Sequence, residues 1–405
     1  MTSKLIEQLA VVTDSKIVLL VIDGLSGIPD NKGKTEKTEL ETANIPNLDA
    51  LARDSICGVT DPISPGITPG SGPAHLSLFG YNPLEYKIGR GLLEALGIDF
   101  PLESGDLCVR GNLSSMDKKG KITDRRAGRI PTEENIKICK LLEGIEIDGV
   151  RVFVKPVKDH RVVIVFRGKG LDDALSETDP QREGLAPLPV KPLGPLAAET
   201  AGIVTKFIEE VKKRLSNSFP ANMILLRGFA KSQQLPSFYE RYKLRAAAIA
   251  SYPMYRGLAR LAGMEILPVG GGEKSLSDEF DCLRQNLDKY DFFYIHVKYT
   301  DSAGEDGNFE KKVAVLEEVD SYMSGLLELN PDVLIVTGDH STPSVLKGHS
   351  WHPVPIILHG RYTGSDDVFR FSEKECAKGG IGRIPATQVM PLAMANALKL
   401  TKYGA

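Results

Sequence analysis

The stretch ITPGSGPAHLSLFGYNP, residues 67–83, places Ser71 between two glycines and ahead of an apolar run. Gly and Pro at this density indicate a turn, and the run from Ala74 to Phe79 is typical of the start of a helix. A serine at such a start is surrounded by backbone N–H groups, which favour anions. Turns also contain these residues for backbone reasons alone, so the chemistry of Ser71 depends on which groups gather around it.

Side chains that bind cations or protons stand next to four apolar segments of the chain. They are Asp23 after the first segment, Lys298, Asp301 and Glu305 after the second, Asp339 and His340 after the third, and His349 before the fourth. Converging carboxylates repel one another unless a cation is present, and oxygen and imidazole ligands together suit zinc or manganese. Six candidate ligands exceed the needs of one tetrahedral ion, so we expect two divalent metals, as is common in phosphoryl chemistry.

Each candidate ligand also has an ordinary structural interpretation. An aspartate after a strand usually caps the next helix, and a single histidine is more often a hydrogen-bonded structural residue. For His75, four residues after Ser71, and for His352, next to Trp351, a structural role is the better hypothesis. An Asp-His pair directly after a strand, together with three similar strand ends, favours the metal site. Beside such metals the Ser71 hydroxyl could ionise and attack phosphorus.

Four buried strands must position these side chains. The near-continuous apolar runs are IVLLVID (17–23), FFYIHVK (292–298), VLIVTGD (333–339) and VPIILHG (354–360). Such runs suit a sheet covered on both faces, and the apolar stripe within 308–330 predicts a helix between two of them. The alternation predicts an α/β fold with a mostly parallel sheet and helices on both faces. In such sheets, ligands bind beyond the carboxyl ends of the strands.

The middle of the chain has shorter alternating runs, at 150–157 and 160–168, and a Pro-rich stretch at 186–196. We interpret residues 87–219 as an α+β domain inserted into the first domain. The metal-binding core would then be discontinuous and comprise residues 1–86 and 220–405.

The composition excludes several function classes. The chain has 405 residues, of which 42% are hydrophobic and 25% charged, and this is ordinary globular composition. The net charge of −3 lacks the excess of basic residues that is typical of a nucleic-acid-binding protein. The longest apolar run, residues 17–22, is too short for a membrane helix, and the N-terminus has no signal-peptide pattern. Five separated cysteines without a Cys-x-x-Cys motif indicate reduced thiols and a cytoplasmic protein.

Eight sequence blocks carry a resemblance to a known family. In order they are IVLLVIDGL, TPGSGPAHLSLFGY, GRGLLEALG, DRRAGR, YRGLARLAGM, HVKYTDSAGEDG, VTGDHSTP and HSWHPVP. Together they resemble the archaeal-type cofactor-independent phosphoglycerate mutases of the alkaline phosphatase superfamily, from about residue 17 to the C-terminus. The resemblance implies interconversion of 3-phosphoglycerate and 2-phosphoglycerate in glycolysis and gluconeogenesis.

The resemblance also implies roles for the candidate residues. Ser71 matches the serine that is phosphorylated, and Asp23, Asp339 and His340 match ligands of the metal that touches it; Asp301 and His349 match ligands of a second metal. Manganese is the expected metal, with zinc, cobalt or magnesium as alternatives. Glu305 stands where related mutases commonly have a histidine; as a ligand it would favour a harder metal. By resemblance, the inserted domain closes over the core and holds the glycerate part of the substrate.

The substrate is anionic at both ends, so cationic side chains should bind it, and guanidinium groups suit both carboxylate and phosphate. The candidates are Arg125, Arg126 and Arg129 in DRRAGR, Arg256 in YRG, and Lys298, which could bind phosphate or donate a proton. A solvated surface position is the alternative for each of them.

The sequence is compatible with two functions besides phosphoglycerate mutase. A metal-dependent phosphatase, or a mutase of another sugar phosphate such as a phosphopentomutase, would share the same ligands. A binding protein that has lost catalysis is favoured only by Glu305. The expected partner is a small phosphorylated substrate, and the sequence leaves the oligomeric state open.

Overall fold

The computed structural model describes residues 2–29, 36–86, 88–232, 235–269 and 275–404. The chain forms two compact units, Met1–Lys87 with Leu235–Ala405 (unit 1) and Ile88–Gln234 (unit 2). The predicted boundary between residues 219 and 220 is wrong, because strand β8 (Met223–Lys231) pairs with β3 (Leu107–Met116) inside unit 2. An apolar strand has the same sequence pattern whichever sheet it joins, so only its pairing reveals its unit.

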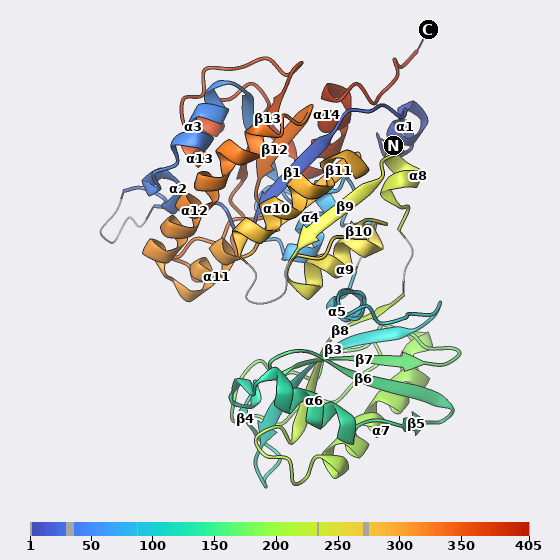
Figure 1. The fold of residues 1–405 in the computed structure, drawn as a ribbon. Coiled ribbons are helices and arrows are strands. Elements are labelled where there is room, and N and C mark those ends of the chain that lie inside the picture. The colour runs from blue at the N-terminus through green and yellow to red at the C-terminus, as the bar shows by residue number, and fades with distance from the viewer. Residues whose placement is uncertain (1, 30–35, 87, 233–234, 270–274, 405) are drawn as a thin grey trace. The chain divides into compact units, whose positions relative to one another are not determined.

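Unit 1 is built on an eight-stranded sheet with the order β10-β9-β11-β1-β12-β13-β2-β14 (Figure 1). The strands are β1 (Ile17–Ile22), β2 (Ile56–Asp61), β9 (Ala246–Ala250), β10 (Glu265–Ile266), β11 (Phe292–Val297), β12 (Val333–Thr337), β13 (Val354–Gly360) and β14 (Gly382–Pro385). The four predicted strands are therefore present as β1, β11, β12 and β13. Only β13 runs antiparallel to its neighbours, so the predicted α/β class with a mostly parallel sheet is confirmed.

The reversal of β13 matters for the site. Strands β1, β11 and β12 end at one edge of the sheet, and the antiparallel β13 begins at that same edge. The loop between β12 and β13 therefore stays there. His349, which lies in this loop, reaches the edge where Asp23, Asp301 and Asp339 follow their strands.

Helices cover both faces of the unit 1 sheet (Figure 1). They are α1 (Thr2–Leu9), α2 (Glu39–Thr42), α3 (Pro46–Arg53), α4 (Ser71–Leu78), α8 (Phe238–Tyr242), α9 (Pro253–Leu261), α10 (Leu276–Asn286), α11 (Tyr299–Asp306), α12 (Phe309–Glu328), α13 (Glu373–Cys376) and α14 (Val389–Asn396), with 3-10 turns at Leu287–Lys289 and Ala386–Gln388. Side chains from α3, α10 and α12 form one core with alternate residues of β1 and β11. On the other face, Phe79 after α4 packs edge-on against Tyr294 of β11, with ring centroids 4.9 Å apart. Among the described residues, no helix is long and apolar enough to cross a membrane.

Unit 2 is an antiparallel sheet with helices. Its strands are β3 (Leu107–Met116), β4 (Ile122–Asp124), β5 (Ile145–Ile147), β6 (Val150–Lys158), β7 (Arg161–Arg167) and β8 (Met223–Lys231), and its helices are α5 (Arg90–Gly97), α6 (Thr132–Leu141) and α7 (Ala198–Arg214), with 3-10 turns at Ala127–Arg129 and Pro195–Ala197. Helices α6 and α7 share a core with the sheet; for example, Phe207 packs edge-on against Phe166. The predicted α+β character of this segment is therefore present.

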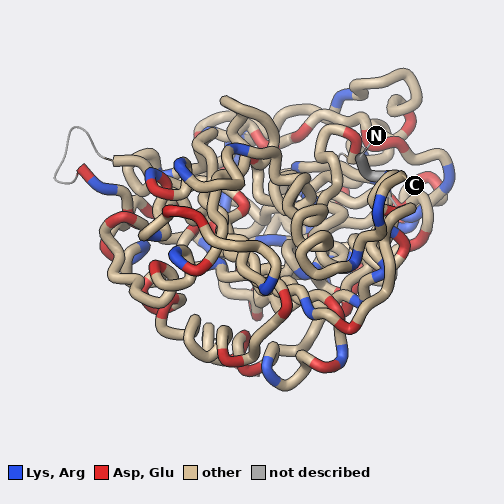
Figure 2. Tube along the Cα trace, turned by 90° about the horizontal axis from the view of Figure 1, so that it is seen from above, with Lys and Arg blue, Asp and Glu red and all other residues tan. Residues whose placement is uncertain are grey.

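Charged residues are distributed along the whole described chain. Figure 2 shows Lys and Arg residues interspersed with Asp and Glu residues along the trace. This mixture agrees with the near-neutral net charge of −3.

Candidate active site

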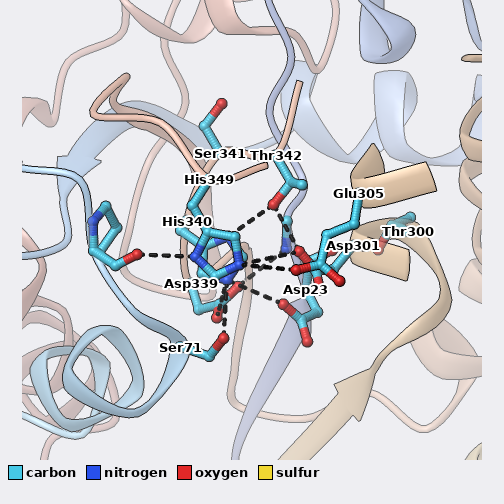
Figure 3. A network of polar contacts seen from close by, with 12 residues as sticks. Asp23, Ser71, Thr300, Asp301, Glu305, Asp339, His340, Ser341, Thr342 and His349 are labelled. Atoms are coloured by element: carbon cyan, nitrogen blue, oxygen red, sulfur yellow. Dashed lines mark hydrogen bonds and ion pairs between the residues drawn. The ribbon is translucent and has the colours of Figure 1, made fainter. Parts of the chain in front are cut away.

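Ser71 is the first residue of α4, and Gly70 before it has the extended backbone of a helix N-cap, with φ −89° and ψ 155°. This turn places the Ser71 hydroxyl 3.2 Å from Nε2 of His340 (Figure 3). The carbonyl of Pro69 in the same turn accepts a hydrogen bond of 2.9 Å from Nδ1 of His349. The glycine- and proline-rich turn therefore contacts the imidazoles of His340 and His349.

Asp23, Asp339 and His340 form a first group of possible metal ligands, all of them buried. Nε2 of His340 lies 3.4 Å from Oδ1 of Asp23 and 3.1 Å from Oδ2 of Asp339. Asp23 follows β1, while Asp339 and His340 follow the neighbouring strand β12, so the parallel pairing of these strands creates the group.

Asp301, His340 and His349 form a second group. Nε2 of His349 lies 3.5 Å from Oδ1 of Asp301, and the rings of His349 and His340 are stacked with centroids 3.7 Å apart. Glu305 is outside both groups: its side chain is 56% exposed, and its Oε1 lies 3.9 Å from Nε2 of His349. The structure thus brings five predicted ligands together, with His340 shared between the two groups.

The chemistry of the first group fits a divalent cation. Oδ1 of Asp23 and Oδ2 of Asp339 are buried and accept no hydrogen bond from any residue that the structure describes. Burial alone would raise the pKa of Asp23, yet the Lys298 ammonium and His296 hold this pKa well below its usual value. Burial lowers the pKa of His340. At neutral pH these groups are therefore carboxylates and a neutral imidazole, which are the protonation states that metal binding requires.

Comparison with known proteins identifies the family. A family model described as 2,3-bisphosphoglycerate-independent phosphoglycerate mutase matches residues 52–222. A protein of Aquifex aeolicus is 50% identical over 99% of both chains, and one of Thermus thermophilus is 48% identical over 99% of this chain and 98% of its own. Both are named "Probable 2,3-bisphosphoglycerate-independent phosphoglycerate mutase". The chain belongs to the 2,3-bisphosphoglycerate-independent phosphoglycerate mutase family.

Solved structures agree with this membership. The PH0037 protein from Pyrococcus horikoshii is 30% identical, with a TM-score of 0.83 over 97% of this chain and 100% of its own. A cofactor-independent phosphoglycerate mutase from Thermoplasma acidophilum is 31% identical, with a TM-score of 0.71 over 95% of this chain and 100% of its own. The chain is therefore an enzyme of the cofactor-independent mutase class, as the sequence blocks predicted.

Lys298 lies among the carboxylates of this mutase. Its ammonium contacts Oδ2 of Asp23 at 3.0 Å and also pairs with Asp301. Burial alone would lower the pKa of Lys298, but the two carboxylates raise it above its usual value. Lys298 is therefore a cation that contacts a carboxylate of each ligand group. From the sequence it was expected to bind phosphate or donate a proton.

Two aromatic residues around Asp23 were missed by the sequence analysis. The Tyr255 hydroxyl donates a hydrogen bond of 2.5 Å to Oδ2 of Asp23, and Nε2 of His296 lies 3.2 Å from the same oxygen. The two rings are stacked, with centroids 3.6 Å apart. Both residues lie in sequence blocks that carry the family resemblance, and this was the available signal.

His75 also adjoins the site, although a structural role was the preferred hypothesis. Its Nδ1 donates a hydrogen bond of 2.8 Å to the carbonyl of Ser71 and lies 3.3 Å from Oδ2 of Asp339. His75 therefore links the helix that begins at Ser71 to a ligand of the first group. His352 belongs to neither group; its Nδ1 lies 2.9 Å from the hydroxyl of Ser350, and its ring stacks on Trp351.

The predicted substrate-binding arginines have different environments. Arg125 makes two hydrogen bonds, of 2.9 and 2.6 Å, to the carboxylate of Asp179 within unit 2. Arg126 and Arg129 are exposed, and Arg256 is half-buried in α9, directly after Tyr255. Arg125 thus has a structural partner, whereas the side chains of Arg126 and Arg129 extend into solvent.

A second set of arginines in unit 2 was not among the predicted substrate-binding residues. Arg110 and Arg161 are half-buried and lie near each other and near the buried carboxylate of Glu94, and Arg227 lies near Arg110. Nε of Arg110 is 3.9 Å from Oε1 of Glu94. Burial, and then the Arg227 guanidinium, lower the pKa of Arg110, although Glu94 opposes this effect. These guanidinium groups come from three separate strands, β3, β7 and β8. No local sequence motif could therefore predict that they lie together.

Proposed function

We propose that this mutase interconverts 3-phosphoglycerate and 2-phosphoglycerate through a phosphorylated Ser71, at a site for two divalent metal ions. The observation that carries the proposal is that two ligand groups, Asp23-Asp339-His340 and Asp301-His340-His349, share His340, whose Nε2 lies 3.2 Å from the Ser71 hydroxyl. The family's full-length relatives, with about half of their residues identical, support the same reaction.

The proposed reaction has two transfers. In the first, Oγ of Ser71 bonds to the phosphorus of 3-phosphoglycerate as its own proton leaves, and the 3-oxygen of glycerate departs with a proton. In the second, the 2-hydroxyl of the retained glycerate attacks the phosphoserine, and Ser71 regains its proton. The chemistry that bound divalent ions supply is neutralisation of charge on the transferring group and on the attacking and leaving oxygens. Lys298 would add a fixed positive charge to the same region.

The mixed carboxylate and imidazole donors suit manganese, with zinc, cobalt or magnesium as alternatives. Asp23, Asp339 and His340 would hold the ion next to Ser71, whose hydroxyl would complete its set of ligands. Asp301 and His349 would hold the second ion. We propose Glu305 as an additional, exposed ligand of the second ion. Its carboxylate would favour a harder metal than a histidine would.

Unit 2 is proposed to bind the glycerate part of the substrate. A mutase must retain glycerate and exclude water between the two transfers, which a hydrolase need not do. Arg110 and Arg161 offer planar, bidentate donors for a carboxylate or phosphate, and Arg126, Arg129 and Arg256 remain proposed substrate contacts. Arg125 is a secondary candidate, because its Nε and one Nη already donate to Asp179.

We also propose that the enzyme acts in glycolysis and gluconeogenesis in the cytoplasm. All five cysteines are free and buried, in agreement with a reducing compartment.

One assay tests the reaction. The full chain is stripped with a chelator, manganese is restored, and 3-phosphoglycerate is supplied without bisphosphoglycerate. Formation of 2-phosphoglycerate, absent before manganese is restored, is the expected result. Release of free phosphate alone would instead indicate a phosphatase. No turnover with manganese, zinc, cobalt or magnesium would indicate a binding protein that has lost catalysis.

A further inference from the structure

Thr342 is a fully buried residue two positions after His340. Its hydroxyl lies 2.7 Å from Oδ1 of Asp301 and 3.0 Å from Nδ1 of His340, so it stands between the two side chains (Figure 3). Asp301 forms an ion pair with the Lys298 ammonium, and the Thr342 hydroxyl donates to its Oδ1, because a carboxylate in an ion pair only accepts hydrogen bonds. The hydroxyl must give its one proton to Asp301, and its oxygen must then accept the proton on Nδ1 of His340.

This direction of the hydrogen bonds fixes the tautomer of His340. With the proton on Nδ1, the other ring nitrogen, Nε2, carries a lone pair. Nε2 faces the hydroxyl of Ser71 at 3.2 Å and the buried oxygens of Asp23 and Asp339 at 3.4 and 3.1 Å. Lone pairs of a nitrogen and two carboxylate oxygens thus converge, as binding of a cation requires.

The protein holds Thr342 firmly in this orientation. Its backbone N–H donates to the carbonyl of Ser26 at 3.1 Å. Its own carbonyl accepts from the ammonium of Lys312 at 2.9 Å, and this fully buried lysine also donates to Ser26. Every polar group of Thr342 therefore has a partner.

Two glycines provide the space for this arrangement. A Cβ atom at Gly24, directly after Asp23, would lie 2.6 Å from the Thr342 hydroxyl, and Gly24 also has a φ of +65°. A Cβ atom at Gly304, within α11, would lie 2.3 Å from the Thr342 carbonyl oxygen. Both distances are far below van der Waals contact, so the close approach of Thr342 depends on glycine at both positions.

We propose that Thr342 is a positioning residue that fixes His340 as the Nδ1–H tautomer and couples it to Asp301, so that both ligand groups use one orientation of the ring. This inference rests on the proposed metal site. Hydrogen-bond partners of metal ligands typically contribute 10- to 100-fold to metal affinity or activity.

Three variants of the full chain test the proposal. Thr342→Val keeps the shape of the side chain and removes the hydroxyl, whereas Thr342→Ser keeps the hydroxyl. Thr337→Val is the matched control, because Thr337 is also buried and its hydroxyl donates at 2.8 Å to the carbonyl of Pro355. The readouts are the ¹⁵N chemical shifts of the His340 ring in metal-free protein, Mn²⁺ affinity by calorimetry, and mutase turnover.

The wild type, Thr342→Ser and Thr337→Val should all show the Nδ1–H tautomer and similar Mn²⁺ affinity. Thr342→Val should lose the tautomer preference and bind Mn²⁺ about 10- to 100-fold more weakly. The inference is overturned if Thr342→Val keeps both the tautomer preference and the Mn²⁺ affinity. It is also overturned if Thr342→Ser or Thr337→Val loses as much tautomer preference and Mn²⁺ affinity as Thr342→Val is expected to lose. Because the tautomer is read in metal-free protein, a wild type that binds no metal would refute the proposed site separately.

Discussion

At the scale of single residues, the site depends on protonation states that neighbouring groups enforce. Burial would raise the pKa of Asp23, but Lys298 and His296 lower it, while burial lowers the pKa of His340. The resulting neutral imidazole lies 3.2 Å from the hydroxyl of Ser71 and next to the carboxylates of Asp23 and Asp339. Ser71 is consequently the residue whose chemistry is most sharply testable.

We expect Ser71→Ala to lower kcat by more than about 10³-fold, because the attacking oxygen is removed. Incubation with ³²P-labelled 3-phosphoglycerate should also leave this variant unlabelled. Ser77→Ala is the control, since Ser77 lies on the same helix and its buried hydroxyl has no hydrogen-bond partner among the described residues. Normal turnover by Ser71→Ala would refute the covalent mechanism, provided that Ser77→Ala is active.

At the scale of elements, the pairing of strands and the course of loops create contacts that the local sequence does not predict. β13 is antiparallel, so the loop that carries His349 returns to the edge where β1, β11 and β12 end. In unit 2, Arg125 follows β4 and pairs with Asp179, whose side chain is fully buried. Burial would raise the pKa of Asp179, but the hydrogen bonds from Arg125 and from the backbone of Gln181 lower it. This pair therefore stabilises unit 2 rather than only presenting a charge to solvent.

We expect Arg125→Ala to lower the free energy of unfolding by about 1–3 kcal/mol, because it leaves a buried carboxylate short of donors. Arg129→Ala, in the same DRRAGR motif but exposed, should change it by no more than about 0.5 kcal/mol. Calorimetric unfolding of both full-length variants measures the difference. Equal stability of the two variants would show that the Arg125–Asp179 pair contributes nothing beyond a surface contact.

At the scale of the whole molecule, buried charges tie distant parts of unit 1 together. Lys312 of α12 lies near the buried Glu39 of α2 and the half-buried Glu373 of α13. Glu373 accepts hydrogen bonds of 2.8 Å from the backbone of Gly27 and from the hydroxyl of Thr38. Burial raises the pKa of Glu373 to about 7, despite these hydrogen bonds and Lys312. Folding is therefore coupled to protonation of Glu373, which is more than 300 residues from Gly27 and Thr38 in the sequence.

This coupling predicts a pH dependence of stability. Unfolded Glu373 should titrate near pH 4.3, whereas the folded protein keeps the proton up to about pH 7. The proton on Glu373 therefore contributes to the free energy of unfolding below about pH 4.3. This contribution is lost as the pH rises towards 7, by at most about 1.4 kcal/mol per pH unit. Glu373→Gln should remove this slope from urea unfolding curves measured with chelator between pH 5 and 8.

Glu375→Gln, on the same helix, is the control for that measurement, because Glu375 pairs with the exposed Lys378. It should retain the wild-type slope. An unchanged slope in Glu373→Gln would mean that the folded protein does not hold the Glu373 proton.

The sequence by itself determined the four central strands, the α/β class, the family and the residues that converge as possible ligands. It could do so because buried strands are continuous apolar runs and because parallel strands deliver the residues that follow them to one edge. The end of the inserted unit, the pairing of Arg125 with Asp179 and the arginines around Glu94 were decided by tertiary structure, since strand and ion-pair partners are separated by tens to hundreds of residues.

Tertiary structure alone also decided how the site is fixed. Tyr255 and His296 meet on one oxygen of Asp23 from different elements. Thr342 reaches Asp301 only because Gly24 and Gly304 leave room for it. The residue types in the sequence were enough to predict which side chains could react. The orientation of a side chain depends on which donors and acceptors folding brings within about 3 Å, and this turns Nε2 of His340 towards Ser71 and Nδ1 towards Thr342.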